Sequence, residues 1–214
     1  TKGRPILAKI GGKTWVKQFD GLRYGTEGLA YYQALAAAEP ENEKYSLLVE
    51  ELEFAVSQGA DKPLFRVAFS DPLHGYAVGA YGMVLETNDG GQTWLPVLEK
   101  IENDAFKHVF DFARLPQPGK FLLSGEAGLL MVGDIEQGIA KKIETGPWEG
   151  SFFTVIDAAD GSIVVGGLRG RMFRTADNGV TWTEAKKPMT SAIVDSTRLA
   201  DDRLEVGRHV AVER

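Results

Sequence analysis

The sequence predicts an all-β protein of the β-propeller class, with blades of four antiparallel strands and an α-helical hairpin inserted between blades. Two observations predict the blades: a phrase that occurs twice with the same internal spacing, and short strand-like runs separated by tight turns. A run of strong helix formers interrupted by a proline predicts the hairpin. We interpret residues 1–214 as one propeller domain or a fragment of one, and residues 27–59 as the helical insert.

The repeated phrase occupies Gly82–Trp94 and again Gly170–Trp182. Each copy joins a glycine, a short β-rich run and a turn that ends in Thr-Trp. The glycines that open these units, Gly79 and Gly167, each stand 15 residues before the tryptophan of their own copy. A supersecondary unit keeps such a fixed internal spacing even where its residues change. The two copies therefore predict two equivalent blades.

Weaker units accompany the two strong ones. Unit starts at Gly125 and Gly207 give periods of 46, 42 and 40 residues from Gly79 onward, and Ala140 stands where the third unit would have its tryptophan. A first unit ends at Trp15, with Ile10 where the strong copies have aspartate. These positions lead us to expect about four to five blades in this chain, which begins and stops inside a blade. Part of a larger seven-bladed propeller and a small ring closed by a shared blade are both open alternatives.

Each unit also has the local pattern of strands. Between Phe65 and Val97 an alternating run, a run of small residues, a β-rich run and a last run after a glycine turn give four strands. The scheme recurs between Leu122 and Thr175, where Asp160-Gly161 is typical of a hairpin turn. Because no helices alternate with these strands, a parallel α/β sheet is disfavoured and radial blades are favoured.

The turn in each strong copy has a structural explanation that needs no ligand. An aspartate accepts hydrogen bonds from backbone N–H groups nearby, the glycine or asparagine after it tolerates positive φ, and the tryptophan supplies apolar surface. We therefore predict structural roles for these residues, rather than catalysis or metal binding. The predicted turn residues are Thr87, Asp89, Gly91, Thr93 and Trp94, and Thr175, Asp177, Gly179, Thr181 and Trp182.

These turns carry a family resemblance. Thr87–Trp94 and Thr175–Trp182 match the Asp-box, or BNR, repeat of sialidase-like propellers, and the wider phrase Gly75–Gly82 resembles the photosystem II assembly and stability factor group, including its non-photosynthetic bacterial branch. The resemblance covers most of residues 1–20 and 64–186. It implies a non-enzymatic propeller of about seven blades that binds proteins. In the bacterial relatives it further implies export, with a periplasmic location and association with membrane exporters.

The segment Leu29–Gly59 does not fit the repeat. Strong helix formers dominate both of its halves, and Pro40 separates them, so we expect two helices. Apolar residues of the second helix recur at helical spacing: Leu48, Leu52 and Ala55 or Val56. One interpretation is an insert that packs on the edge of the propeller. The other is a docking element for a partner protein, since a propeller needs no such insert to complete its sheets.

Composition limits the partners and cofactors. A net charge of −6 and a pI of about 5.2 disfavour a nucleic-acid partner, because binding to phosphates requires a basic surface. The chain has no cysteine, so disulfides and thiolate metal sites are excluded, and no apolar run is long enough to span a membrane. The glycine-rich run Gly166–Gly170 does not open a helix, which disfavours phosphate binding. We expect no cofactor.

Five residues are candidates for contact with a partner protein. Arg169 and Arg171 flank Gly170 and would suit an acidic partner, although arginines at a strand edge also serve as solvated edge protection. Tyr31, Tyr32 and Tyr45 gather around the insert, and aromatic residues are common in interfaces. Packing in the core is the favoured explanation for most of the tyrosines.

The function predicted from the sequence is a non-enzymatic binding or assembly module of the bacterial cell envelope, accessory to a membrane exporter, with a membrane-associated protein as partner. Its three histidines, His74, His108 and His209, stand in no motif of a metalloprotease or of a hydrolase nucleophile. We predict no catalytic, metal-binding or cofactor-binding residue. The alternative is a sialidase-like glycan hydrolase or glycan-binding propeller, which would require an arginine cluster and a Tyr–Glu pair at the propeller centre.

Overall fold

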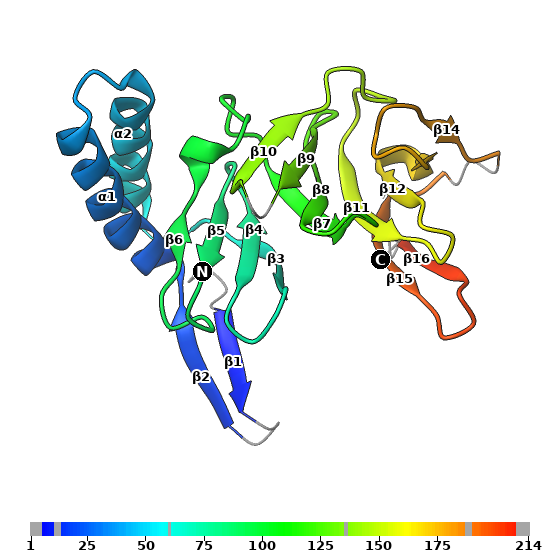
Figure 1. Ribbon diagram of the computed structural model, residues 1–214, viewed down its shortest axis with the longest axis horizontal. Coiled ribbons are helices and arrows are strands. Elements are labelled where there is room, and N and C mark those ends of the chain that lie inside the picture. Colours follow the sequence, from blue (N-terminus) through cyan, green and yellow to red (C-terminus); the bar gives the residue numbers. More distant parts are fainter. Residues whose placement is uncertain (1–5, 11–13, 60, 135–136, 187–189, 209–214) are drawn as a thin grey trace, which may run out of the picture. The chain divides into compact units, whose positions relative to one another are not determined.

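A computed structural model describes residues 6–10, 14–59, 61–134, 137–186 and 190–208. The chain divides into two compact units, Thr1–Glu99 and Lys100–Arg214. Its elements are mostly β: three four-stranded antiparallel sheets, two two-stranded sheets and two α-helices (Figure 1). The four-stranded sheets and the pair of helices that the sequence predicts are therefore confirmed.

The first unit contains a two-stranded hairpin, both helices and one four-stranded sheet. Strands β1 and β2 pair with each other, and β3, β4, β5 and β6 follow one another across their sheet in chain order. The bounds are β1 Ile6–Ile10, β2 Thr14–Phe19, α1 Gly21–Ala38, α2 Glu43–Gln58, β3 Leu64–Phe69, β4 Gly75–Gly79, β5 Val84–Thr87 and β6 Leu95–Pro96. A short 3-10 turn, Leu98–Lys100, follows β6. The glycine pair of the first predicted unit, Gly11-Gly12, lies outside the described residues.

The second unit contains two four-stranded sheets and a two-stranded one, again with neighbours in chain order. The bounds are β7 Val109–Arg114, β8 Lys120–Gly125, β9 Leu130–Asp134, β10 Ile139–Lys142, β11 Phe152–Asp157, β12 Ile163–Gly167, β13 Met172–Thr175, β14 Thr183–Glu184, β15 Ile193–Arg198 and β16 Leu204–Arg208. A 3-10 turn, Leu168–Gly170, joins β12 to β13. The sheet without an Asp-box is complete, and Ala140 is buried in its last strand.

The first strands of the three sheets in the second unit lie side by side, β7 next to β11 and β11 next to β15. A buried carboxylate links them, since one oxygen of Asp111 accepts hydrogen bonds from the Val155 N–H at 3.0 Å and from the Thr154 hydroxyl at 3.1 Å. That hydroxyl also lies 2.6 Å from the hydroxyl of Ser196 in β15. Phe152, Val155 and other apolar side chains form the core beside this ladder. Strands arranged in this way are expected where sheets surround an axis.

The first strand of every sheet in the predicted repeat carries a β-bulge at the same place. The register shifts between Leu64 and Arg66, Val109 and Asp111, Phe152 and Thr154, and Ile193 and Asp195. In three of these sheets a glycine of the second strand faces the bulge. A Cβ added to it would lie only 2.5, 2.3 or 2.0 Å from the carbonyl oxygen of the residue that precedes the first strand. These glycines are Gly79, Gly125 and Gly167. The repeated glycine is thus required by close backbone approach.

The fourth unit start, expected at Gly207, is displaced by one residue. In β15 and β16, Ile193 pairs with Arg208, so Arg208 holds the place of Gly167 and Gly207 holds that of Gly166. The unit period varies by several residues, so it cannot distinguish position 207 from position 208, and the glycine at 207 favours the wrong one. A Cβ at Gly207 would meet its nearest neighbour at 3.4 Å, which is an ordinary contact.

The first helix begins earlier than expected. We expected the insert to start at residue 27, with helix formers from Leu29, whereas α1 begins at Gly21. Asp20 caps it, because its carboxylate accepts hydrogen bonds at 3.1 Å from the N–H groups of Leu22 and Arg23. Two glycines of α1, Gly25 and Gly28, serve close packing against α2. A Cβ on Gly28, for example, would lie 3.0 Å from the Leu52 side chain on α2.

The bulge glycines generate the first prediction. In Gly167→Ala the new methyl group would lie 2.0 Å from the Ser151 carbonyl, so the backbone must shift. We expect the free energy of unfolding to fall by about 1–3 kcal/mol, as for overpacking elsewhere. The matched control, Gly207→Ala, should change it by less than about 0.5 kcal/mol. Urea titration of both variants measures this, and equal losses would contradict the role of the bulge.

Candidate protein-binding surfaces

The Asp-box between β5 and β6 is a closed network of hydrogen bonds. Both carboxylate oxygens of Asp89 accept from Thr93, with the backbone N–H at 2.9 Å and the hydroxyl at 2.7 Å. The Thr87 hydroxyl donates to the same carboxylate at 2.9 Å and accepts from the Gly91 N–H at 2.8 Å. These donors lower the pKa of Asp89 to about 2, with the Thr93 N–H as the largest cause.

The turn between β13 and β14 repeats this network. Asp177 accepts from the Thr181 N–H at 2.8 Å and from its hydroxyl at 2.6 Å, and the Thr175 hydroxyl links the carboxylate to the Gly179 N–H. The Thr181 hydroxyl is the largest cause of a pKa of about 2 for Asp177. Both carboxylates are thus already occupied by their own turns, which leaves them ill suited to bind a cation or to transfer a proton at neutral pH.

The two box tryptophans serve as apolar anchors in different degrees. Trp94 is wholly buried, and its ring makes an edge contact with Phe69. Trp182 is half-buried against the core of the second unit and donates its ring N–H to the Gly179 carbonyl at 3.0 Å. Both positions lie directly before the last strand of a sheet, so they attach that strand to the rest of its unit.

The helical hairpin is fixed by one face. Leu48, Leu52 and Ala55 of α2 are buried, whereas Val56 is largely exposed. From α1, the Tyr32 hydroxyl donates to the Glu99 carboxylate at 2.7 Å and accepts from the Leu98 N–H at 2.8 Å, in the turn after β6. Burial of each large apolar side chain contributes about 1.5–3 kcal/mol. The hairpin is therefore an integral part of its unit.

The opposite face of α2 is exposed. Leu47 and Phe54, 46% and 57% exposed, stand two helical turns apart on one line with two exposed carboxylates. We call this stripe the hairpin surface: Glu43, Leu47, Glu50 and Phe54 of α2. Helical spacing of apolar residues predicts the buried stripe of this helix, whereas this exposed stripe was not predicted. The sequence does contain a signal for it, since Leu47 and Phe54 are seven residues apart, which is two helical turns, and Glu50 lies between them on the same line.

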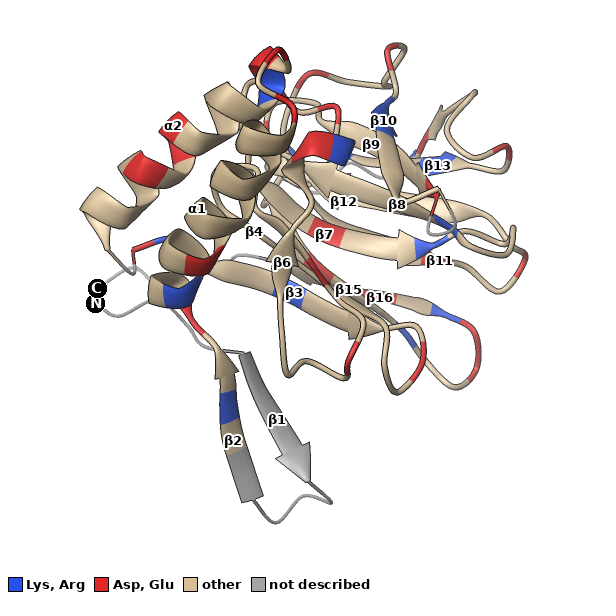
Figure 2. Cartoon of the chain, turned by 60° about the vertical axis from the view of Figure 1, so that its left-hand side comes forward, with Lys and Arg blue, Asp and Glu red and all other residues tan. Residues whose placement is uncertain are grey.

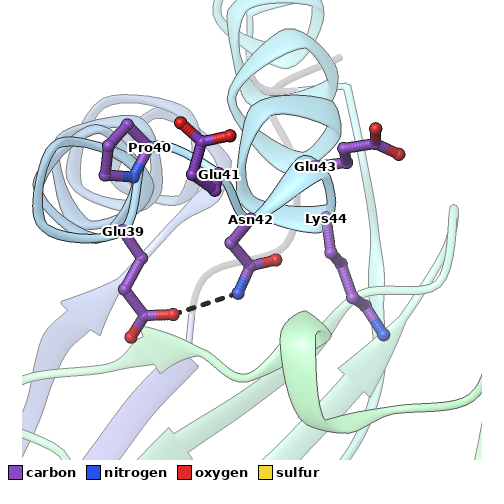
Figure 3. A pocket seen from close by; sticks show the side chains of 6 residues that line it. All are labelled: Glu39, Pro40, Glu41, Asn42, Glu43 and Lys44. Carbon is purple, nitrogen blue, oxygen red and sulfur yellow. Dashed lines mark hydrogen bonds between the residues drawn. The ribbon is translucent and has the colours of Figure 1, made fainter.

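A shallow hollow lies at the tip of the hairpin, lined by Glu39, Pro40, Glu41, Asn42, Glu43 and Lys44 (Figure 3). Asn42 donates its side-chain N–H to the Glu39 carboxylate at 3.2 Å. The carboxylates of Glu39 and Glu43 point in different directions (Figure 3). They do not converge on one point as metal ligands would.

The hairpin also concentrates the acidic charge of the protein. Residues 39–58 contain six glutamates and one lysine, a net charge of −5 out of −6 for the whole chain. Acidic positions on α2 and at the tip are visible in Figure 2. One of these glutamates, Glu51, is paired internally with the buried Lys62 at 2.9 Å. The others leave a strongly negative potential around the tip and outer face of the hairpin.

The three candidate tyrosines have different environments. Tyr32 is wholly buried and bonded as described, which fits the core-packing explanation for this tyrosine. Its aromatic ring fills the space beneath α1. Tyr31 is partly exposed, and burial is the main cause that raises its pKa to about 12. Tyr45 on α2 is also partly exposed.

The two candidate arginines lie in the other unit, beside β13. The Arg171 guanidinium donates two hydrogen bonds to the Glu184 carboxylate, at 2.6 and 2.7 Å, and stacks over the rings of Trp148 and Phe173. These contacts hold Arg171 within its own sheet. Arg169 is exposed, in the turn after β12, with a φ of 58°.

Among the described residues no group of three or more His, Cys, Asp or Glu side chains could hold a metal ion. His74 lies in the turn before β4, with its ring N 2.8 Å from the Asp71 carboxylate, and His108 lies 3.8 Å from Glu126. His209 falls outside the described residues. Within the described part of the chain no helix is both long and apolar enough to cross a membrane.

Comparison with known families decides the relationship. Residues 51–212 match the model of the family described as "Photosynthesis system II assembly factor YCF48". The chain belongs to this family. The match includes both described Asp-boxes and extends from α2 to β16, and therefore confirms the relationship to photosystem II assembly factors that the repeats indicate.

Curated members of the YCF48 family are distant relatives. The rice photosystem II stability/assembly factor HCF136 (Oryza sativa subsp. japonica) is 24% identical over 137 residues, which are 63% of this chain and 33% of the relative. The photosystem II assembly lipoprotein Ycf48 of Synechococcus sp. (strain CC9902) is 28% identical over 135 residues, or 62% of this chain and 39% of the relative. The chain thus matches little more than a third of the length of these relatives.

Solved structures of the same family share the fold. The structure described as "YCF48 bound to D1 peptide" aligns with a TM-score of 0.56 at 23% identity, and covers 67% of this chain and 46% of its own. The WD40 β-propeller domain of Doa1 aligns with a TM-score of 0.53 at 16% identity, over 68% of this chain and 47% of its own. These likenesses support the propeller-type fold predicted from the repeats.

The Asp-box networks generate a pH prediction. A pKa lowered by folding stabilises the fold above the unfolded value of about 3.9, and this contribution is lost as the pH falls towards the folded value near 2. We expect Asp89→Asn combined with Asp177→Asn to lower the Tm at neutral pH, and the difference from wild type to shrink below about pH 4.

The control for this measurement is Asp61→Asn, which removes one carboxylate from an exposed position in the segment before β3. Its Tm should follow that of the wild type over the whole range. Thermal unfolding followed by circular dichroism provides both curves. A Tm difference that stays constant down to about pH 2 would show that the carboxylate networks contribute nothing through their charge.

Proposed function

We propose that this protein is a non-enzymatic protein-binding module that takes part in the assembly of a membrane-associated complex, and that the hairpin surface is its docking site. Two observations support the proposal. The chain belongs to a family of assembly factors, and a relative has been solved with a bound peptide. The hairpin, fixed by its inner face, exposes large apolar side chains on its outer one.

The exposed apolar side chains carry the docking proposal. Leu47 and Phe54 cost free energy in water because their apolar surface remains hydrated, and contact with a partner would recover part of it. The exposed strand side chains of β3 include Phe65 and Val67, but a propeller covers such faces with neighbouring sheets. A helix on the outside of its sheet has no such neighbour in a propeller.

The proposal further locates the protein in the bacterial cell envelope, in the periplasm, as a scaffold accessory to a membrane exporter. This part rests on the resemblance of the Gly75–Gly82 phrase to the non-photosynthetic bacterial branch of the family. It also takes the chain to be part of a larger propeller of about seven blades, the size that the resemblance implies. A fractionation experiment with the full-length protein tests the location.

The alternative, a sialidase-like glycan hydrolase, rests on the resemblance of the Asp-box turns. Those turns engage their carboxylates in internal hydrogen bonds with Thr93 and Thr181. A fluorogenic sialoside assay decides between the two functions, and turnover above that of a heat-denatured control would overturn the non-enzymatic proposal.

Point substitutions test the docking site better than removal of the hairpin. Deletion of residues 29–59 would take away Tyr32 and expose Pro96 and the Leu98 N–H that α1 covers, so loss of binding could reflect unfolding. The double variant Leu47→Ser with Phe54→Ser changes exposed side chains only. A matched control, Val180→Ser with Val194→Ser, removes exposed apolar surface from the other unit.

We expect affinity capture from detergent-solubilised cell envelopes to recover a defined partner with the wild type and with the control variant. The Leu47/Phe54 variant should lose most of it, about tenfold or more, because anchors of this size contribute on the order of 1–2 kcal/mol each. Circular dichroism verifies that all three proteins are folded. Equal recovery of the same partner by both variants would refute the hairpin surface as the docking site.

A further inference from the structure

We infer that the partner presents a cationic amphipathic helix to the hairpin surface, with lysines or arginines interleaved with large apolar residues. This inference deepens the proposed function and rests on it. It names the chemistry of the partner from the order of side chains along α2, from the charge of the hairpin and from the hollow at its tip.

The order of side chains on the hairpin surface is acidic, apolar, acidic, apolar. Glu43, Leu47, Glu50 and Phe54 follow one another at intervals of four, three and four residues, so they form one line along the helix. Leu47 and Phe54 stand about 10 Å apart along the axis, given a rise of 1.5 Å per residue. A second helix packed alongside offers apolar and basic side chains at the same spacing.

The carboxylates of this line are available to a partner. Within the described part of the chain, neither Glu43 nor Glu50 forms an ion pair, and both side chains are exposed. Glu51, on the neighbouring line, is instead committed to the buried Lys62. On α2, Glu51 therefore stabilises the fold of its own unit, whereas Glu43 and Glu50 face solvent.

The net charge selects against anionic partners. The hairpin segment 39–58 carries −5, so it repels nucleic-acid phosphates and the anionic leaflet of a membrane. A basic protein segment is attracted by the same field, which steers its approach and raises the association rate. The complementary occupant of this face is thus a basic helix and not a lipid surface.

The hollow at the tip adds a place for one further cation. Its lining includes three carboxylates, those of Glu39, Glu41 and Glu43, and one ammonium, that of Lys44, so it keeps a net negative charge. The carboxylates are spread around the hollow and do not converge (Figure 3), which suits the several donors of a guanidinium or a mobile ammonium better than a small metal ion. A basic residue at the end of the partner helix would reach this position.

The test uses a fluorescent synthetic peptide of about five helical turns, in which lysine and leucine are placed so that both lie on one face. A scrambled peptide of the same composition distributes them around the helix, and a third peptide has glutamate in place of lysine. Fluorescence anisotropy gives the Kd of each peptide for the wild-type protein. We expect the lysine–leucine helix to bind and the other two peptides to bind at least about tenfold more weakly.

Two charge variants complete the experiment. Glu43→Gln with Glu50→Gln should weaken binding of the amphipathic peptide by about tenfold and reduce its dependence on salt. Glu149→Gln with Glu205→Gln removes the same charge from exposed positions of the other unit and should leave the Kd within about twofold.

Equal effects of the two charge variants, or equal binding of the scrambled peptide, would overturn the inference. The outcome also separates it from the proposed function. If the peptide fails to bind while partner capture still depends on Leu47 and Phe54, the docking site is right and the partner chemistry is wrong. If capture is independent of these residues as well, both proposals fail.

Discussion

The attachment of α1 to the end of β6 determines what the hairpin can do. Tyr32 satisfies the Leu98 N–H and the Glu99 carboxylate at once, and Gly28 lets the helix approach Leu52 and Pro96 closely. Loss of a buried hydrogen-bond partner of this kind costs about 1–3 kcal/mol. Because the inner face is held so firmly, α2 must direct its other face outward. The exposed stripe is a consequence of that constraint.

The repeat made most of the sheets predictable, because glycine is required where a Cβ would collide with the facing backbone. The strand scheme expected between Leu122 and Thr175, for example, is present and ends with β13 at Thr175. The same reliance on glycine produced the errors. The repeat spacing points to Gly207, whereas Arg208 occupies the bulge position, and α1 begins at Gly21, before the strong helix formers. Glycine is favoured both at a β-bulge and where two helices pack closely. The sequence alone does not show which of these two close contacts a given glycine allows.

The candidate surface was predictable only in part, since residue type does not report direction. Tyr32 and Tyr31 are adjacent in the sequence, yet one is wholly buried and the other partly exposed. Arg171 was a candidate for contact with a partner or for edge protection, and its guanidinium is paired with Glu184 and stacked on two aromatic rings of its own unit. Leu47 and Leu48 are likewise neighbours on α2, and the first is exposed while the second is buried. The fold decides which member of each pair faces solvent.

Acidic side chains serve two separate purposes in this protein. In the Asp-boxes each carboxylate accepts hydrogen bonds from its own turn, and Asp111 in the second unit accepts one from the Val155 N–H of the neighbouring sheet, so these carboxylates hold strands in place. On the hairpin, most carboxylates stand in solvent, where they contribute little to stability and repel one another. A fold gains nothing from collecting five units of negative charge on one helical appendage. The concentration of charge there, next to exposed leucine and phenylalanine, is instead what a basic amphipathic partner would recognise.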